Sequence, residues 1–217
     1  MARTRTSKAW MMQHVNDPYV RRAADEGMRS RAAYKLMQIN EKDKLLKPGM
    51  LVVDLGATPG GWSQVAGRIV LPAGRVIAID VLEMTGLPGV TFIQGDFAEA
   101  AGLAAVERAL AGAPVDLVLS DMAPNISGIA MVDQSRLIGL VELALDFAAK
   151  HLKPQGNFLV KIFQGAGFDA YVQAMREVFV QVQTRKPDAS RKGSREVYLL
   201  GKGLKGAQGG LRGLEGA

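Results

Sequence analysis

The stretch from residue 52 to residue 62, V-V-D-L-G-A-T-P-G-G-W, limits the possible folds of this chain more than any other feature. An apolar run ends at Asp54, a glycine-rich turn follows, and Trp62 begins a segment with helical periodicity. A buried strand, a tight loop and a helix in this order are typical of the first βα turn of a doubly wound sheet. Because ligands bind outside the carboxyl ends of the strands in such sheets, the turn predicts a ligand site.

The spacing of the glycines argues against two common ligands. Gly56, Gly60 and Gly61 enclose Pro59 and do not form the G-x-G-x-x-G fingerprint of dinucleotide binding. The G-K-[ST] end of a phosphate-binding P-loop is also missing. A glycine-rich turn that only packs the strand against the helix remains the alternative at this point.

The rest of the chain alternates between short apolar runs and amphipathic segments. Helices are predicted at 30–44, 61–70, 99–111, 133–152 and 168–179, and strands at 50–55, 75–80, 90–94, 115–120, 157–163, 180–185 and 196–200. Ser30 is the expected N-cap of the first helix, and the last two strands are expected to form a hairpin-like pair at the sheet edge. The pattern predicts an α/β fold with a mostly parallel seven-stranded sheet and helices on both faces.

The length of 217 residues is typical of a single domain. We interpret residues 1–29 as a basic N-terminal arm, irregular up to residue 28, residues 30–202 as the domain, and residues 203–217 as a flexible Gly-rich tail. No apolar stretch approaches the ~20 residues that span a membrane, and the basic N-terminus lacks the apolar run of a secretory signal. We therefore expect a cytoplasmic protein that does not bind membranes.

The metal-binding and thiol chemistry of this chain is limited by its composition. It has no cysteine and only two histidines, His14 and His151. The absence of cysteine excludes disulfide bonds, thiolate metal sites and covalent cysteine chemistry. With two histidines, a zinc site is not expected either, so we predict no metal.

The net charge of +6 is concentrated at the two ends of the chain. Residues 1–35 carry eight Lys and Arg against three Asp and Glu, residues 185–217 carry the same numbers, and residues 36–184 have a net charge of −4. Basic clusters of this kind favour binding to a polyanion, although a solvated surface with a soluble tail is the alternative. The candidate phosphate contacts are Arg3, Arg5, Lys8, Arg21 and Arg22 in the arm and the loop Arg185–Arg195.

Carboxylates stand at the ends of four predicted strands. Asp54, Asp80, Asp96 and Asp121 are expected to meet at one edge of the sheet. This edge disfavours a phosphate-bearing cofactor and favours a cationic one. S-adenosylmethionine fits, because it combines a sulfonium cation with a ribose for Asp80 and an adenine for Asp96. Acidic residues are also common as helix N-caps, which is the alternative for each of them.

Three further side chains could take part in chemistry at this edge. Lys161 lies in the apolar run F-L-V-K-I-F, where a lysine is costly unless it is paired. It is either a functional amine near Asp121 or a strand-end lysine that reaches solvent. Glu196 is the only acid of the last strand and could instead discourage aggregation at the sheet edge. Lys35 by itself would indicate a solvated helix face.

Four segments together resemble the FtsJ/RrmJ (RlmE-type) family of S-adenosylmethionine-dependent RNA 2′-O-ribose methyltransferases. They are D-L-G-A-T-P-G-G-W-S-Q, L-S-D-M-A-P-N-I-S-G, V-K-I-F-Q-G and R-K-P-D-A-S-R-x-x-S-R-E-V-Y-L. The resemblance extends from about Trp10 to Leu200 and implies a Rossmann-like class I methyltransferase fold. It implies a catalytic tetrad of Lys35, Asp121, Lys161 and Glu196. The cofactor-binding residues that it implies are Gly60, Trp62, Asp80, Asp96 and Asp121.

The resemblance also implies a substrate and a reaction. The chain would methylate the 2′-hydroxyl of a uridine in large-subunit (23S) ribosomal RNA, within the ribosomal particle, as a monomer. Lys161 would accept the hydroxyl proton as a neutral amine or orient the oxygen. Burial and Lys35 favour the neutral amine, whereas Asp121 and Glu196 favour the ammonium, and the sequence leaves both open. Thr58 stands where the commonest form of the loop has alanine, and the Gly-rich tail is not a family feature.

The sequence lacks features that several other functions require. Methylation of pyrimidine C5 through a covalent adduct needs a cysteine nucleophile. Methylation of exocyclic amines usually shows [N/D]-P-P-[Y/F], whereas the corresponding segment here is Asp121-Met-Ala-Pro-Asn125. The glycine spacing and the acidic edge argue against a nicotinamide dehydrogenase. A tRNA 2′-O-methyltransferase and a non-catalytic RNA-binding ribosome-assembly factor remain the alternatives.

Overall fold

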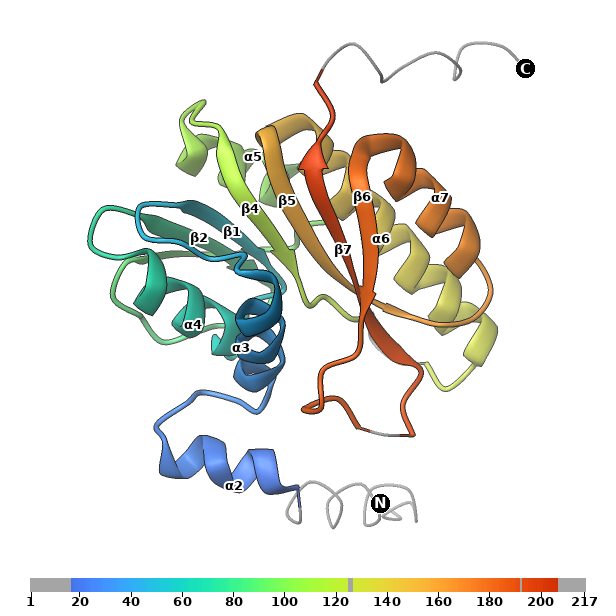
Figure 1. The fold of residues 1–217 in the computed structure, drawn as a ribbon, viewed down its shortest axis with the longest axis horizontal. Coiled ribbons are helices and arrows are strands. Elements are labelled where there is room, and N and C mark those ends of the chain that lie inside the picture. The colour runs from blue at the N-terminus through green and yellow to red at the C-terminus, as the bar shows by residue number, and fades with distance from the viewer. Residues whose placement is uncertain (1–16, 125–126, 192, 207–217) are drawn as a thin grey trace.

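The computed structural model describes residues 17–124, 127–191 and 193–206, which contain one mixed sheet. Its strands are β1 (Leu51–Leu55), β2 (Arg75–Asp80), β3 (Val90–Gln94), β4 (Val115–Ser120), β5 (Leu152–Phe163), β6 (Phe179–Arg185) and β7 (Glu196–Leu204). They lie in the order β3-β2-β1-β4-β5-β7-β6 (Figure 1). Neighbours are parallel except at β7, which runs antiparallel to β5 and β6. The predicted α/β fold with a mostly parallel seven-stranded sheet is confirmed.

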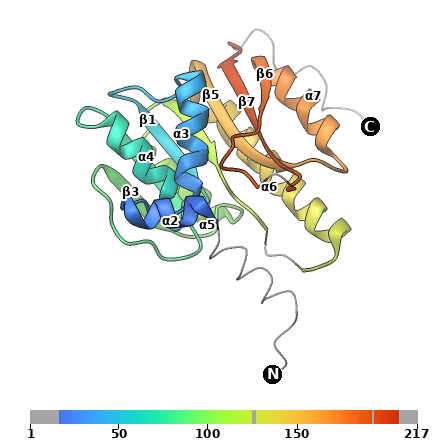
Figure 2. The same ribbon diagram turned by 60° about the horizontal axis from the view of Figure 1, so that its bottom comes forward.

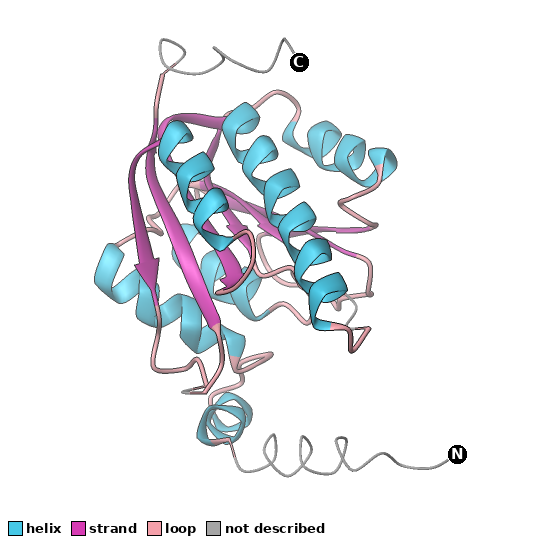
Figure 3. Ribbon diagram, turned by 90° about the vertical axis from the view of Figure 1, so that its right-hand side faces the viewer, coloured by secondary structure: helices cyan, strands magenta, loops and turns pink. Residues whose placement is uncertain are grey.

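Helices cover both faces of the sheet (Figure 3). They are α2 (Pro18–Asp25), α3 (Ala32–Asp43), α4 (Gly61–Val70), α5 (Ala100–Leu110), α6 (Ala130–His151) and α7 (Phe168–Val178). Helices α3 and α4 share a core with Val52 and Leu119 on one face. On the other face, α5, α6 and α7 pack against Val53 and Val118. Both faces of the central strands are therefore buried, which explains their continuous apolar runs. In the described part of the chain, no helix is both long and apolar enough to cross a membrane.

The structure differs from the sequence-based prediction most clearly in three places. The arm predicted as irregular contains α2, which the Asp17 side chain caps by accepting a hydrogen bond from Tyr19 N at 3.0 Å. β5 begins at Leu152, because Leu152 already pairs with β4. β7 continues to Leu204 beside β6, so residues 203 and 204 belong to the sheet. The remaining parts of the predicted arm and tail, 1–16 and 207–217, lie outside the described residues.

The predicted pairing of the last two strands is confirmed, but only β6 lies at the sheet edge. β7 is inserted between β5 and β6. Because β7 is antiparallel to β5, its first residue, Glu196, pairs with Phe163, the last residue of β5. The insertion therefore brings the start of β7 to the edge where the parallel strands end.

The loop that joins β6 to β7 lies beside α3 (Figure 2). Its Ala189 N–H donates a hydrogen bond to Gln38 Oε1 at 2.9 Å, and the Arg31 guanidinium donates to the Ala189 carbonyl. The N-terminal helices and the C-terminal loop consequently enclose the same end of the sheet.

Candidate active site

The turn between β1 and α4 depends on glycines with a left-handed backbone. Gly56 and Gly60 have φ angles of 78° and 103°, which residues with a Cβ rarely adopt. A Cβ on Gly60 would also lie 2.7 Å from the sulfur of Met84. The Thr58 N–H donates a hydrogen bond to Asp80 Oδ2 at 2.9 Å, which holds the turn against the end of β2. The sequence thus builds a fixed wall at this end of the sheet.

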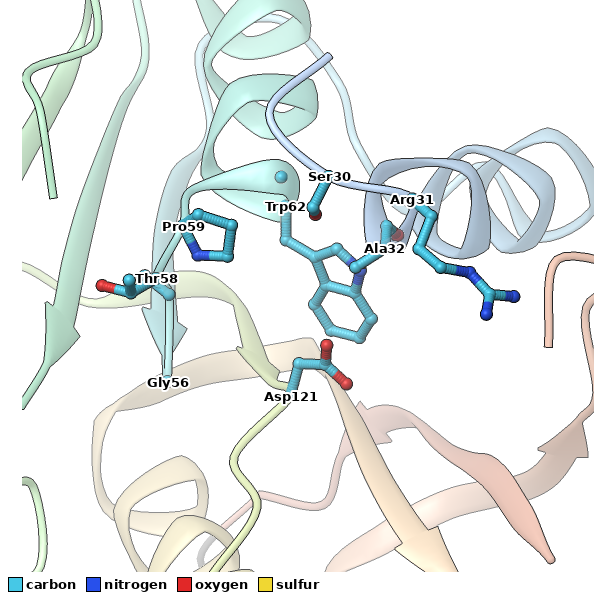
Figure 4. A pocket seen from close by; sticks show the side chains of 10 residues that line it. Ser30, Arg31, Ala32, Gly56, Thr58, Pro59, Trp62 and Asp121 are labelled. Atoms are coloured by element: carbon cyan, nitrogen blue, oxygen red, sulfur yellow. The ribbon is translucent and has the colours of Figure 1, made fainter. Parts of the chain in front are cut away.

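A pocket of about 160 Å³ lies between this turn and the start of α3 (Figure 4). The indole of Trp62 forms one wall and donates from Nε1 to the Ala32 carbonyl at 2.8 Å. Its ring also packs against Tyr198, with 5.5 Å between the ring centroids. The Asp121 carboxylate enters from the end of β4. The pocket therefore lies where a doubly wound sheet is expected to bind its ligand.

Ser30 does not cap α3 as the sequence suggested. Arg31 is the N-cap residue, and no side-chain hydrogen bond caps the helix there. The Ser30 hydroxyl is buried beside the pocket, and no described residue forms a hydrogen bond with it. Since a buried hydroxyl without a partner destabilises the fold, this position favours a polar group on a ligand.

Asp80 and Asp96 stand at the ends of β2 and β3, outside the lining of this pocket. Asp80 accepts hydrogen bonds from Thr58 N at 2.9 Å and from Leu82 N at 2.8 Å. Asp96 is exposed and accepts from Ala98 N at 2.9 Å. A carboxylate has about four acceptor positions. Both side chains can therefore still accept hydrogen bonds from hydroxyl or amino groups.

The prediction that four carboxylates share this edge is wrong for Asp54. Its side chain is fully buried, accepts a hydrogen bond from Ser63 Oγ at 2.6 Å, and leaves Oδ1 without a partner among the described residues. Burial raises the pKa of Asp54 to about 7, the Ser63 hydrogen bond opposes this rise, and the charges of Asp121 and Asp80 add to it. The edge therefore carries the carboxylates of Asp80, Asp96 and Asp121, which are three rather than four.

Two ion pairs lie next to each other where β4 and β5 end and β7 begins. Lys161 Nζ is 3.1 Å from Asp121 Oδ1 and also donates to the Asp121 carbonyl. Lys35 Nζ donates to Glu196 Oε1 at 2.7 Å. The four side chains are 9–19% exposed, so water screens these pairs less than it screens pairs on the surface. The structure thus brings together Lys35, Asp121, Lys161 and Glu196.

Tyr198, which we did not single out in the sequence, joins the two ion pairs. Its hydroxyl lies 3.3 Å from Asp121 Oδ1 and 3.3 Å from Glu196 Oε1. Burial raises the pKa of Tyr198 well above its usual value, and the two carboxylates act in the same direction. The hydroxyl therefore stays protonated and donates to one carboxylate at a time. Strand alternation, which places Tyr198 on the same face as Glu196, was the signal that could have found it.

The carboxylate of Glu196 is stabilised in its ionised form. Ser190 Oγ donates to Glu196 Oε1 at 2.9 Å, in addition to Lys35. Burial alone would raise the pKa of Glu196, but the charge of Lys35, the hydrogen bonds from Lys35 and Ser190, and the charge of Lys161 together lower it. Glu196 is consequently an anion at neutral pH that holds Lys35 in place.

Arg29 is a second residue that the sequence analysis missed. Its guanidinium donates to the carbonyls of Thr85 at 2.6 Å, Gly86 at 2.7 Å and Pro59 at 3.3 Å. It ties the segment before α3 to the glycine turn and to the loop after β2. No spacing pattern in the sequence indicates contacts between residues so far apart.

Several of the predicted phosphate contacts have partners within the chain, among them Arg22, Arg185 and Lys186. Arg22 pairs with Glu26 at 2.6 Å on the surface, and Arg185 pairs with Asp43 at 2.6 Å. The second pair is largely buried, so Arg185 is already held by a carboxylate. The predicted contacts that lie outside the described residues are Arg3, Arg5 and Lys8 of the arm and Lys192 of the loop.

Comparison with known proteins places this site in a family. A family model described as FtsJ-like methyltransferase matches residues 28–204. The chain belongs to the FtsJ-like methyltransferase family. The match includes the glycine turn, both ion pairs and Tyr198, and it confirms the family that four sequence segments indicated.

Two relatives match nearly the whole chain. The ribosomal RNA large subunit methyltransferase E of Azoarcus sp. (strain BH72) is 64% identical over 205 residues, which are 94% of this chain and 100% of that protein. The protein of the same name from Chromobacterium violaceum is 59% identical, over 94% of this chain and 99% of its own length. This chain is therefore a methyltransferase rather than a nicotinamide dehydrogenase.

A solved structure shows the same fold in a related protein. A Plasmodium falciparum protein described as a ribosomal RNA methyltransferase has a TM-score of 0.72 and 28% sequence identity with this chain. The match covers 81% of this chain and 98% of that one. The FtsJ-like sheet is thus shared by chains whose sequences have diverged widely.

The buried Asp54 of this methyltransferase predicts a pH-dependent stability. Its folded pKa of about 7 lies above its ordinary value of 3.8, so between these pH values the folded state keeps a proton that the unfolded chain has lost. The free energy of unfolding consequently falls as the pH rises from about 4 to about 7, by roughly 4 kcal/mol at most for this group.

Replacing Asp54 by asparagine should remove this loss of stability with rising pH. We expect the Tm of Asp54→Asn, relative to that of the parent, to be higher at pH 8 than at pH 4.5. Thermal unfolding followed by circular dichroism at the two pH values measures this difference. A Tm difference that is the same at both would show that Asp54 ionises normally in the folded protein.

Proposed function

We propose that this chain transfers a methyl group from S-adenosylmethionine to the 2′-hydroxyl of a uridine ribose in large-subunit (23S) ribosomal RNA, within the ribosomal particle. The observation that carries the proposal is the position of the Lys161–Asp121 pair, directly beside the pocket formed by the glycine turn. The names of the relatives, at 59–64% identity, support the ribosomal RNA of the large subunit as the acceptor.

The residues at this edge fit S-adenosylmethionine in charge and in hydrogen bonding. Asp80, Asp96 and Asp121 make the edge negative, which favours a cationic ligand, and the unpartnered Ser30 hydroxyl offers a polar contact. The pocket of about 160 Å³ is smaller than the ~300 Å³ of small ligand sites. We therefore place only part of the cofactor there, with its ribose held by Asp80 and its adenine by Asp96. When bound, S-adenosylmethionine supplies an electrophilic methyl group.

Lys161 is the proposed base for the ribose hydroxyl. A 2′-hydroxyl is a weak nucleophile while protonated, and a neutral Lys161 Nζ would accept its proton as the oxygen attacks. General-base help of this kind typically contributes 10²–10⁴-fold. The ion pair with the Asp121 carboxylate and the hydrogen bond to the Asp121 carbonyl fix the direction in which Nζ points. If Lys161 also orients the hydroxyl oxygen toward the methyl group, the rate of methyl transfer rises further.

Lys35, Glu196 and Tyr198 are proposed to position this base. Glu196 fixes the Lys35 ammonium at 2.7 Å, and Tyr198 links Glu196 to Asp121. The buried network thus fixes geometry and charge before RNA binds.

The remaining features of the proposal concern the whole chain. The seven-stranded sheet, with β7 inserted antiparallel to its neighbours, supports a Rossmann-like class I methyltransferase fold. We propose that the methyltransferase domain predicted for residues 30–202 extends to the end of β7 at Leu204, with a basic arm before it and a tail after it. We also propose that the protein acts in the cytoplasm as a monomer.

The choice of methyl acceptor tests the proposed function. Purified protein and S-adenosylmethionine labelled in the methyl group are incubated with unmethylated large ribosomal subunits, with naked ribosomal RNA and with tRNA. We expect the subunits to be methylated fastest. Preferential labelling of tRNA would favour the tRNA methyltransferase, and binding without any labelling would favour the assembly factor.

A further inference from the structure

Basic side chains gather around the end of α3. On this face of the sheet, α3 and α4 leave β5, β7 and β6 uncovered (Figure 1). The centre of the group is Asp43, whose side chain is only 3% exposed. It binds Arg185 of β6 through two hydrogen bonds of 2.6 and 2.7 Å and Lys202 of β7 at 2.7 Å. The hydrogen bond from Arg185 is the main reason that the pKa of Asp43 falls to about 2. Two cations are therefore held in place by one buried carboxylate.

Two more lysines stand beside this ion cluster and have no partner among the described residues. Lys42 and Lys44 are exposed, and no carboxylate in the described ranges lies within ion-pair distance of their amino groups. The cations of this region thus outnumber its carboxylates, Asp43 and Glu41. An excess of fixed positive charge of this kind repels itself and attracts polyanions. We call Lys42, Lys44, Arg185 and Lys202 the α3–β6 basic patch.

The patch lies close to the lysines of the candidate active site. Arg185 and Lys161 both pair with Tyr198, one from each side, so two strand spacings, about 10 Å, separate them. Lys42 follows Lys35 by seven residues on α3, which places both on the same side of the helix about 10 Å apart. The patch therefore extends the active-site edge along one continuous surface.

We propose that the α3–β6 basic patch binds the phosphates of the RNA strand next to the methylated ribose. The inference rests on the proposed function for the identity of the RNA. It adds Lys42 and Lys44, which lie at the end of α3 and outside the two basic ends of the chain. Phosphate contacts of this kind position the strand and carry no sequence information. The patch therefore sets how the target ribose enters the active site, not which base is chosen.

A double charge reversal tests the patch. Lys42→Glu with Lys44→Glu is compared with Arg108→Glu with Arg176→Glu, which changes the net charge equally. Arg108 and Arg176 lie in the last turns of α5 and α7, on the opposite face of the sheet. The control thus places glutamates at similar helix ends. The probe is a fluorescent single-stranded oligouridylate, whose binding is followed by anisotropy at several salt concentrations.

We expect the Lys42/Lys44 variant to bind the oligouridylate at least about tenfold more weakly at low salt. The slope of log affinity against log salt should shrink by about 1.4, which corresponds to two lost phosphate contacts. The Arg108/Arg176 control should bind like the parent, and both should bind S-adenosylmethionine like the parent. On large ribosomal subunits, KM should rise for the Lys42/Lys44 variant while kcat is retained.

Two outcomes would overturn the proposal. The first is equal loss of RNA binding in both double variants, which indicates a general effect of net charge. The second is parental binding to the oligouridylate with a raised KM on subunits only, which indicates that the patch contacts a ribosomal protein. Lys42→Gln with Lys44→Gln repeats the test without new negative charges, should the first variant unfold. RNA binding is measured without methyl transfer. A failure of the patch proposal can therefore be distinguished from a failure of the proposed function.

Discussion

Replacing Lys161 by alanine is expected to lower the rate of methyl transfer by roughly a thousandfold, within the range of general-base effects. The affinity for S-adenosylmethionine should change by no more than a few fold, because Lys161 contacts Asp121 rather than the glycine turn. Single-turnover transfer of labelled methyl to large ribosomal subunits measures the first quantity, and calorimetry measures the second.

Two further variants separate chemistry from folding. Lys161→Met keeps the apolar stem of a side chain that is buried in β5, so it preserves packing and removes only the amine. Lys153→Ala removes a lysine of the same strand, which pairs with Asp116 at the far end of the sheet. We expect Lys161→Met to be as slow as Lys161→Ala and Lys153→Ala to match the parent. A parental rate in Lys161→Met would remove the amine from the mechanism.

Replacing Asp80 by alanine should weaken S-adenosylmethionine binding by roughly a hundredfold. Hydrogen bonds to a charged group contribute about 1.5–3 kcal/mol, and the free acceptor positions of Asp80 are the proposed contacts of the ribose. The variant also releases Thr58 N and Leu82 N, which Asp80 holds at 2.9 and 2.8 Å. Isothermal titration calorimetry measures the change in Kd.

The matched control for Asp80 is Asp116→Ala. Asp116 also accepts a hydrogen bond from a backbone amide, that of Leu51 at 2.8 Å, but it lies at the opposite end of the sheet. We expect Asp116→Ala to bind the cofactor like the parent. If Asp80→Ala also bound with parental affinity, Asp80 would only hold the loop and would not belong to the cofactor site.

The regular elements could be predicted because their signals are local. The strands at 75–80, 90–94 and 115–120 and the helix at 61–70 have the predicted bounds. Each is a short apolar or amphipathic run that is flanked by turn-forming residues. The segment at 153–156 misled the prediction, since Pro154 and Gly156 are typical turn residues, yet Leu152 already pairs with β4.

The parts of the site that the sequence did not reveal depend on contacts between distant segments. Arg29 reaches carbonyls 56 and 57 residues away, and Arg185 reaches Asp43 across 142 residues. Asp54 looked like the other strand-end carboxylates, but its side chain faces Ser63 of α4 inside the core. Periodicity predicts which face a residue occupies, and it does not predict whether that face is covered.

The position of the transferred methyl group tests the central claim most directly. Unmethylated large ribosomal subunits are incubated with the protein and labelled S-adenosylmethionine, the ribosomal RNA is digested to nucleosides, and the labelled nucleoside is identified by mass spectrometry. The proposed function predicts a single labelled product, 2′-O-methyluridine. Label on a nucleobase would contradict the assignment of Lys161 as the base for a ribose hydroxyl.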